Sequence, residues 1–97
     1  MTKKNRYVIV RGNRSGVFAG TVHSVKGTEV VLLDCRRIWY WDGAASLSQL
    51  AIEGPSKPDN CKFPIAMNKV LVLDAIEIID VTPQARKVIE GVKVWRV

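Results

Sequence analysis

The sequence predicts a mainly β or α+β domain, built as an antiparallel meander or a small barrel-like sheet with one or two short helices. Short apolar runs rich in Val, Ile and Leu recur along the 97 residues and are separated by turns that contain Gly, Pro or Asn. The turns between the early runs are too short for crossover connections, which favours antiparallel neighbours. Only two segments carry the signals of a helix start.

The first half of the chain predicts four strands, at residues 7–11, 17–24, 29–34 and 36–41. A loop with glycines at both ends, residues 12–16, separates the first two. The run at 29–34 is apolar through its middle, as expected of a strand buried on both faces. The run at 36–41 would place its odd-numbered and even-numbered side chains on opposite faces of the sheet.

The second half predicts two short helices and four later strands. Ser46 followed by Gln49 has the form of a capping box, which predicts a helix over 46–53 that ends before a glycine. Thr82 stands as an N-cap before a proline at the first helical position, which predicts a helix over 83–90. The remaining runs predict strands at 62–67, 70–73, 75–81 and 92–97.

Composition is that of one globular domain over residues 1–97, with 47% hydrophobic and 25% charged residues. No apolar run approaches the roughly 18 residues of a membrane span, and the basic N-terminus lacks the long apolar stretch of a signal peptide. The two cysteines, Cys35 and Cys61, match neither a disulfide framework nor a zinc signature. We therefore expect a cytoplasmic protein without a membrane partner, in which residues 1–6 form a mobile basic arm.

The net charge of +6 comes entirely from the first 41 residues. That segment holds eight Lys and Arg against two Asp and Glu, whereas basic and acidic side chains balance in residues 42–97. A one-sided basic field favours anionic partners such as phosphates, nucleic acid or an acidic protein surface. A solvated, solubilising surface explains the same charge without any partner.

No set of residues in the sequence assembles an active site. His23 is the single histidine and has no nucleophile–base arrangement around it, and no Gly-Lys-Ser/Thr phosphate loop occurs. Asp74, Glu77 and Asp80 would cluster on a helix, but on the strand expected there they alternate, and we expect them to face solvent. The sequence therefore predicts binding rather than catalysis, with no catalytic residues, metal or cofactor.

The densest functional candidate is the segment 36–41, which combines arginines with aromatic residues. Guanidinium groups bind phosphate bidentately and aromatic rings stack on nucleobases, so this pattern is typical of nucleotide or single-strand binding. The glycine-flanked loop 12–16 and its arginines form a second candidate for an anion. Core or interface packing explains the aromatic residues equally well. The candidate ligand-binding residues are Arg36, Arg37, Trp39, Tyr40, Trp41, Arg11 and Arg14.

The string from Arg36 to Leu50, RRIWYWDGAASLSQL, together with residues 7–11 and 75–79, resembles a family of small uncharacterised proteins found in bacteriophages and prophages. The family is a domain of unknown function, and the resemblance runs from about Tyr7 to Thr82. The resemblance assigns no role to any residue of this sequence. It implies a context in which small proteins without enzymatic motifs inhibit host defence, some by blocking a host protein and others as oligomeric sponges that hold nucleotide signals between subunits.

The resulting hypothesis is a phage-encoded homo-oligomeric sponge that acts in the cytoplasm of the infected bacterial host. Its ligand would be an anionic nucleotide of the cyclic nucleotide or cyclic ADP-ribose type. Arg36 and Arg37 would hold phosphates, and Trp39, Tyr40 or Trp41 would stack on a base. Arg11 and Arg14 could close the pocket. Three alternatives remain: a single-stranded nucleic-acid binder, an inhibitor that binds a host defence protein directly, and a structural or regulatory protein with this strand between subunits.

Overall fold

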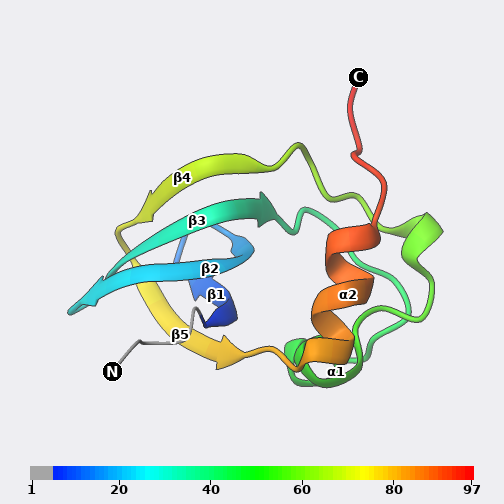
Figure 1. The fold of residues 1–97 in the computed structure, drawn as a ribbon, viewed down its shortest axis with the longest axis horizontal. Coiled ribbons are helices and arrows are strands. Elements are labelled where there is room, and N and C mark those ends of the chain that lie inside the picture. The colour runs from blue at the N-terminus through cyan, green and yellow to red at the C-terminus, as the bar shows by residue number, and fades with distance from the viewer. Residues whose placement is uncertain (1–5) are drawn as a thin grey trace.

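The computed structural model describes residues 6–97 and shows a curved five-stranded antiparallel sheet with two short helices against it (Figure 1). The α+β class and the antiparallel arrangement predicted from the sequence are confirmed. The strands are β1 (Tyr7–Gly12), β2 (Val17–Lys26), β3 (Glu29–Arg37), β4 (Met67–Val72) and β5 (Ala75–Asp80). The helices are α1 (Leu47–Glu53), α2 (Pro83–Gly91) and the 3-10 turn η1 (Pro58–Asn60).

The sheet has the strand order β4-β3-β2-β1-β5, so the two edge strands follow one another in the sequence. Only Leu73 and Asp74 separate the end of β4 from the start of β5. Because this connection is so short, the two edges of the sheet have to lie close together at that point, and the sheet curls on itself (Figure 1). The result is an open, strongly curved sheet rather than a closed barrel.

Two bulges bend the middle of the sheet. β3 has one extra residue opposite the stretch from Ala19 to Thr21, and Asp34 takes a positive φ of 50° there. β2 has its own extra residue, His23, between two positions that pair with consecutive residues of β3. Bulges increase the local twist and bend the strand that carries them. They allow β2 and β3 to follow the curl that the short β4–β5 connection imposes.

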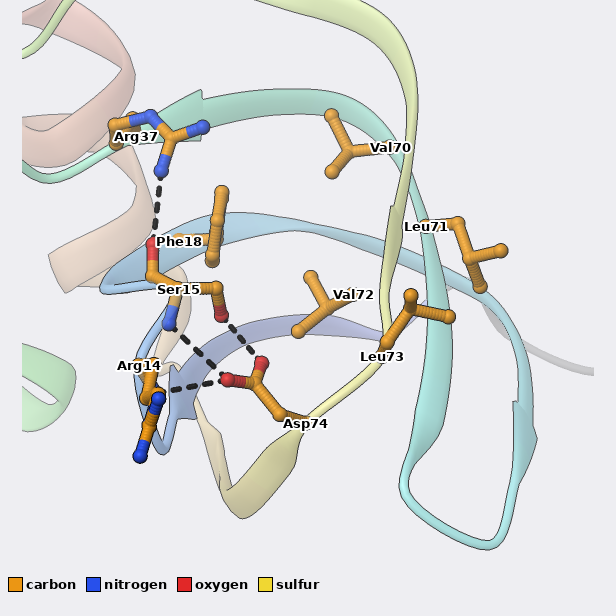
Figure 2. Close-up of a pocket in the computed structure, with 9 residues that line it drawn as sticks. All are labelled: Arg14, Ser15, Phe18, Arg37, Val70, Leu71, Val72, Leu73 and Asp74. Carbon is orange, nitrogen blue, oxygen red and sulfur yellow. Dashed lines mark hydrogen bonds between the residues drawn. The ribbon is translucent and has the colours of Figure 1, made fainter.

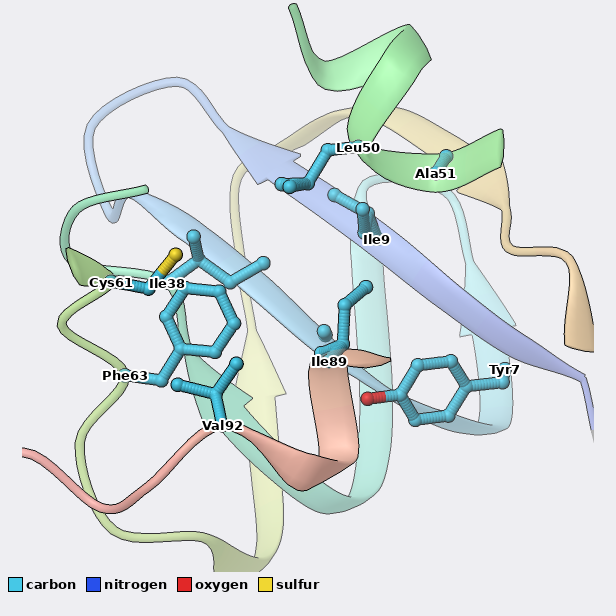
Figure 3. Close-up of a cluster of buried hydrophobic side chains, with 10 residues drawn as sticks. Tyr7, Ile9, Ile38, Leu50, Ala51, Cys61, Phe63, Ile89 and Val92 are labelled. Atoms are coloured by element: carbon cyan, nitrogen blue, oxygen red, sulfur yellow. The ribbon is translucent and has the colours of Figure 1, made fainter. Parts of the chain in front are cut away.

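β1 is buried on both faces and separates two hydrophobic cores. Val8 and Val10 point to the inside of the curled sheet, and Tyr7 and Ile9 point to the helices, as the alternation of a strand requires. The core inside the curl also contains Phe18, Val30, Leu32, Cys35, Val72 and Ala75. The core on the helix side also contains Ala19, Ile38, Leu50, Ala51, Cys61, Phe63, Ile89 and Val92 (Figure 3).

Both predicted helix starts are confirmed. The hydroxyl oxygen of Ser46 accepts a hydrogen bond from the backbone N–H of Gln49 at 3.3 Å, and that of Thr82 accepts one from Ala85 at 3.0 Å. The Thr82 hydroxyl also donates to the carbonyl oxygen of Ile52 at 2.7 Å, which ties the start of α2 to α1. Among residues 6–97, no helix is long and apolar enough to span a membrane.

The prediction of a strand over 36–41 is wrong. The runs predicted as two strands form the single strand β3, which ends at Arg37. The backbone N–H of Ile38 still donates to the carbonyl of Val17 at 2.8 Å, but β2 begins at that valine and offers no further partner. Beyond this point Tyr40 makes only an isolated bridge with Lys62.

Among the described residues, the strands predicted at 62–67 and 92–97 do not form as predicted. Lys62 and Phe63 take part only in isolated bridges, the second of them with Val94, and β4 begins at Met67. The basic arm expected at residues 1–6 lies outside the described residues except for Arg6. The guanidinium of Arg6 donates to Asp80 at 2.7 Å.

Candidate functional site

Two adjoining hollows lie where the β1–β2 loop approaches the end of β3. The smaller has a volume of about 300 Å³, and we call it the tryptophan hollow. The residues that line it alone are Gly16, Val17, Ile38, Trp39 and Trp41. The larger has a volume of about 460 Å³, and we call it the valine hollow. The residues that line it alone are Phe18, Val70, Leu71, Val72, Leu73 and Asp74 (Figure 2). Arg14, Ser15 and Arg37 line both hollows and form the wall that they share.

Asp74 fixes the loop that supplies this wall. Its Oδ2 accepts hydrogen bonds from the backbone N–H groups of Arg14 at 2.7 Å and Ser15 at 3.1 Å, and its Oδ1 accepts one from the Ser15 hydroxyl at 2.5 Å (Figure 2). A Cβ at Gly12 would collide with Ser15 Oγ and lie 2.8 Å from Asp74 Oδ1, so a larger residue there would displace the side chains that hold the loop. The hydrogen bonds from the Ser15 hydroxyl and the Arg14 N–H hold the pKa of Asp74 below its usual value.

This role of Asp74 corrects the expectation that it faces solvent. The carboxylate is half-buried and accepts three hydrogen bonds from a loop about 60 positions earlier in the chain. Glu77 and Asp80 are exposed, as expected, and each forms an ion pair at the surface. The alternation of a strand separates these carboxylates correctly, but it gives no information about a distant loop that returns to the end of the strand.

Arg37 crosses from β3 to the loop. One terminal nitrogen of its guanidinium donates to the carbonyl oxygen of Ser15 at 2.9 Å, and the group lies 4.6 Å from the centre of the Phe18 ring. Within residues 6–97, the remaining N–H groups of this guanidinium have no protein acceptor. Figure 2 shows the second terminal nitrogen directed away from Ser15, on the side of Val70. Arg37 therefore keeps free donors for an anionic ligand.

Arg36 does not belong to the site, and the prediction that it holds a phosphate is wrong. Its side chain is 5% exposed and points into the helix-side core. All five of its N–H donors go to backbone carbonyl oxygens, at distances of 2.7–3.4 Å. These carbonyls belong to Phe63, Pro64, Ile89, Val92 and Lys93. The guanidinium thus anchors the end of the chain and the segment before β4, and it has no donor left for a ligand.

The aromatic residues divide between two environments. Trp39 is 64% exposed and lines the tryptophan hollow together with Trp41, whose indole N–H donates to the carbonyl of Ala44 at 3.1 Å. The rings of Trp39 and Trp95 lie parallel, with ring centres 6.5 Å apart and planes 4° apart. Tyr40 lines neither hollow, and its ring lies 5.9 Å from the ammonium of Lys62.

The structure therefore brings together Arg14, Arg37, Trp39 and Trp41 in one hollow. Arg11 stays apart, because it forms an ion pair with Glu77 at 3.6 Å on the neighbouring strand β5. Sequence reasoning missed the contributions of Ser15 and Asp74, since nothing in their local pattern distinguishes them from ordinary surface residues. Two cationic side chains beside an exposed indole can bind an anion that carries a planar ring.

The cysteines are buried thiols. Burial raises the pKa of Cys35 to about 12, and it also raises the pKa of Cys61. Both therefore stay protonated at neutral pH, whereas the thiolate is the form that reacts with electrophiles and binds metals. Among residues 6–97, no three His, Cys, Asp or Glu side chains are grouped so that they could hold a metal ion.

Comparison with known protein families finds a match over most of the chain. A family model described as a domain of unknown function (DUF6948) matches residues 5–89, which is most of the chain. No curated protein and no solved structure matches the chain.

Proposed function

We propose that this chain, which belongs to the DUF6948 family of unknown function, binds an anionic nucleotide in the tryptophan hollow and does not transform it. The observation that carries the proposal is the convergence of Arg14 and Arg37 with Trp39 and Trp41 around one hollow. Its volume of about 300 Å³ stands at the lower end of the range for small-molecule sites.

The arginines supply the anion-binding half of the site. Arg37 has free N–H donors, and Arg14 is exposed on a loop whose backbone is held by Asp74. The carboxylate of Asp74 accepts three hydrogen bonds from that loop, and among residues 6–97 it forms no ion pair with Arg14 or Arg37. Charge-assisted bonds from guanidinium to phosphate are about twice as strong as neutral hydrogen bonds.

The tryptophans supply the ring-binding half. An indole that is 64% exposed is a large apolar surface left in contact with water, and stacking a nucleobase on it contributes about 1–3 kcal/mol. The ring of Trp95 lies parallel to that of Trp39, with the ring centres 6.5 Å apart, and adds a second aromatic surface beside the first. A tryptophan side chain has only two rotatable torsions, so it loses little conformational freedom when a base stacks on it.

Capture without turnover would suit a phage-encoded inhibitor of host defence, which removes a nucleotide signal from the cytoplasm of the infected bacterium. A homo-oligomer would present several hollows at once and would act as a sponge. This role is supported by the concentration of the +6 net charge in the first 41 residues, which include Arg14 and Arg37. A basic field of this kind accelerates the encounter with anionic ligands.

The test is a titration of the purified protein with mononucleotides, cyclic dinucleotides, cyclic ADP-ribose and short oligonucleotides, followed by intrinsic tryptophan fluorescence and melting temperature. At a hundredfold excess over the dissociation constant, binding stabilises by about 2.7 kcal/mol, which is roughly 10–20 °C for a domain of this size. Arg37→Ala and Trp39→Ala should each weaken binding at least about tenfold. Arg11→Ala, which removes the same charge outside the hollow, should leave the affinity within about twofold. A flat panel, or equal losses in all three variants, would refute the proposal.

A single-stranded nucleic acid is the second candidate, because exposed rings continue beyond the hollow. Trp95 stands beside Trp39, and the Lys62 ammonium lies 5.5 Å from the Trp95 ring and 5.9 Å from that of Tyr40. Aromatic rings interleaved with cations are typical of single-strand binders. This candidate requires an affinity that falls steeply with salt, with a slope of about −0.7 for each phosphate contacted. A single mononucleotide would give a much shallower dependence.

A further inference from the structure

We infer that the site has two chambers, and that its ligand carries two ring systems joined through phosphate, as a dinucleotide does. The inference rests on the proposed function, since it takes the tryptophan hollow as the place of the first base. The second chamber is the valine hollow, on the other side of the wall formed by Arg14, Ser15 and Arg37.

Arg37 is the partition between the chambers. Its bond to the Ser15 carbonyl spans the space between the end of β3 and the β1–β2 loop, and the same guanidinium lines both hollows. Figure 2 shows one terminal nitrogen bonded to Ser15 and the other pointing away from it. A phosphate bridge that crosses this wall would meet Arg37 midway, with Arg14 on the adjoining loop as a second cation.

The chemistry of the valine hollow fits a ring rather than a further phosphate. Phe18, Val70 and Val72 form an apolar floor, and Leu73 at the rim is 61% exposed (Figure 2). The carboxylate of Asp74, on the same hollow, would repel an anion placed there. Apolar walls with a few polar groups are typical of sites that bind the flat part of a ligand. At about 460 Å³ the hollow has room for one.

Two apolar chambers on either side of a cationic wall favour a ligand with two linked rings over a mononucleotide. A mononucleotide would use one chamber and leave the exposed apolar rim of the other in water. When two groups are joined by a short linker, the second binds at an effective concentration in the millimolar range. A dinucleotide should therefore bind at least about tenfold more tightly than the matching mononucleotide, even though it carries no more negative charge per nucleoside.

The experiment compares AMP with diadenosine diphosphate, two adenosines joined through a pyrophosphate, by titration calorimetry, with the guanine pair in parallel. Leu73→Trp places a bulky ring at the rim of the valine hollow, on a side chain exposed enough to tolerate it. It should reduce the affinity for the dinucleotide to that for AMP and leave AMP unchanged. Ile76→Trp is the matched control, since Ile76 is 54% exposed on β5 and lines neither hollow. It should change neither affinity.

The outcomes separate this inference from the proposed function. If mononucleotides bind and dinucleotides bind within twofold of them in both base series, the second chamber is refuted and the first stands. A loss of AMP affinity in Leu73→Trp equal to the loss for the dinucleotide would also refute two independent chambers. If no nucleotide binds to the wild-type protein, both proposals fail together.

Discussion

Arg36 and Arg37 are neighbours in the sequence, but their guanidinium groups lie on opposite faces of β3. Arg36 donates to carbonyls that surround the helix-side core, at 2.7 Å to Val92. Arg37 lies 4.6 Å from the Phe18 ring and donates to Ser15 at the wall between the two hollows. The alternation of a strand thus separates a residue that holds the fold from one that is available to a ligand.

The first prediction concerns stability at this pair. Arg36→Ala leaves buried carbonyls without donors, and we expect it to lower the free energy of unfolding by about 3–5 kcal/mol. Arg37→Ala loses one hydrogen bond and one contact over a ring, and should cost about 1 kcal/mol. Urea unfolding followed by circular dichroism measures both. If Arg36→Ala does not fold, Arg36→Lys, with three donors instead of five, should still be less stable than Arg37→Lys. Equal stability of the paired variants would contradict the role of Arg36.

The second prediction concerns pH and the loop. The pKa of Asp74 is lowered in the folded state, first by the Ser15 hydroxyl and then by the Arg14 N–H. Its contribution to stability is therefore fully present above the ordinary value of 3.8 and is lost as the pH falls below it. Asp74→Asn should lower the melting temperature at pH 7, and this difference from wild type should shrink towards pH 3.

The matched control for Asp74 is Glu77→Gln, which removes a carboxylate of the same sheet that does not hold the loop. Asp74→Asn should also weaken nucleotide binding, because the loop that carries Arg14 loses its anchor. Glu77→Gln should leave binding unchanged. A melting-temperature difference for Asp74→Asn that stays constant from pH 7 to pH 3 would show that the carboxylate does not carry the effect.

The third prediction concerns alkaline pH. Burial raises the pKa of Cys35 to about 12, so the thiol stays neutral in the folded state, whereas the same thiol in the unfolded chain has a pKa of 9.0. The contribution of the neutral thiol is present below pH 9 and is lost as the pH rises towards 12. Wild type should therefore lose stability as the pH rises from 9.0 towards 12, and Cys35→Ala should lose less. Parallel pH profiles of the two proteins would contradict the burial of this thiol.

The fourth prediction concerns the two stacked tryptophans. A double-mutant cycle with Trp39→Ala, Trp95→Ala and the double variant should give a coupling of about 0.5–1.5 kcal/mol in the free energy of unfolding. Additive losses would show that the rings do not interact in solution. The same variants distinguish the two candidate ligands. Trp95→Ala should weaken oligonucleotide binding strongly only if the protein is a single-strand binder.

The elements predicted well are those that local chemistry specifies. The caps at Ser46 and Thr82 are decided within four residues, and the structure confirms both. The strand predicted over 36–41 was wrong because a strand needs a neighbour to pair with. Beyond the hydrogen bond from Ile38 to Val17, β2 has no further residue that could pair with the chain. The chain therefore leaves the sheet despite the strand propensity of its residues.

The site was predicted in part for the same reason. Alternation separates the two arginines, but it cannot say which face of β3 will be covered by the helices and the end of the chain. The carbonyls that bind Arg36 are 27 to 57 positions away in the sequence. Asp74 is equally remote from the loop that it holds. Contacts of this separation depend on the complete fold and leave no local pattern.

The short connection of Leu73 and Asp74 places the valine hollow at the seam of the curled sheet, where β4 has a free edge. An unpaired edge strand is a place where a sheet can add a foreign strand or open. A ligand that reached from the tryptophan hollow into the valine hollow would contact both β4 and the β1–β2 loop, and would hold the two edges of the sheet together. Hydrogen exchange of the β4 amides would then slow on binding, because the ligand would cover one of the two edges of the sheet.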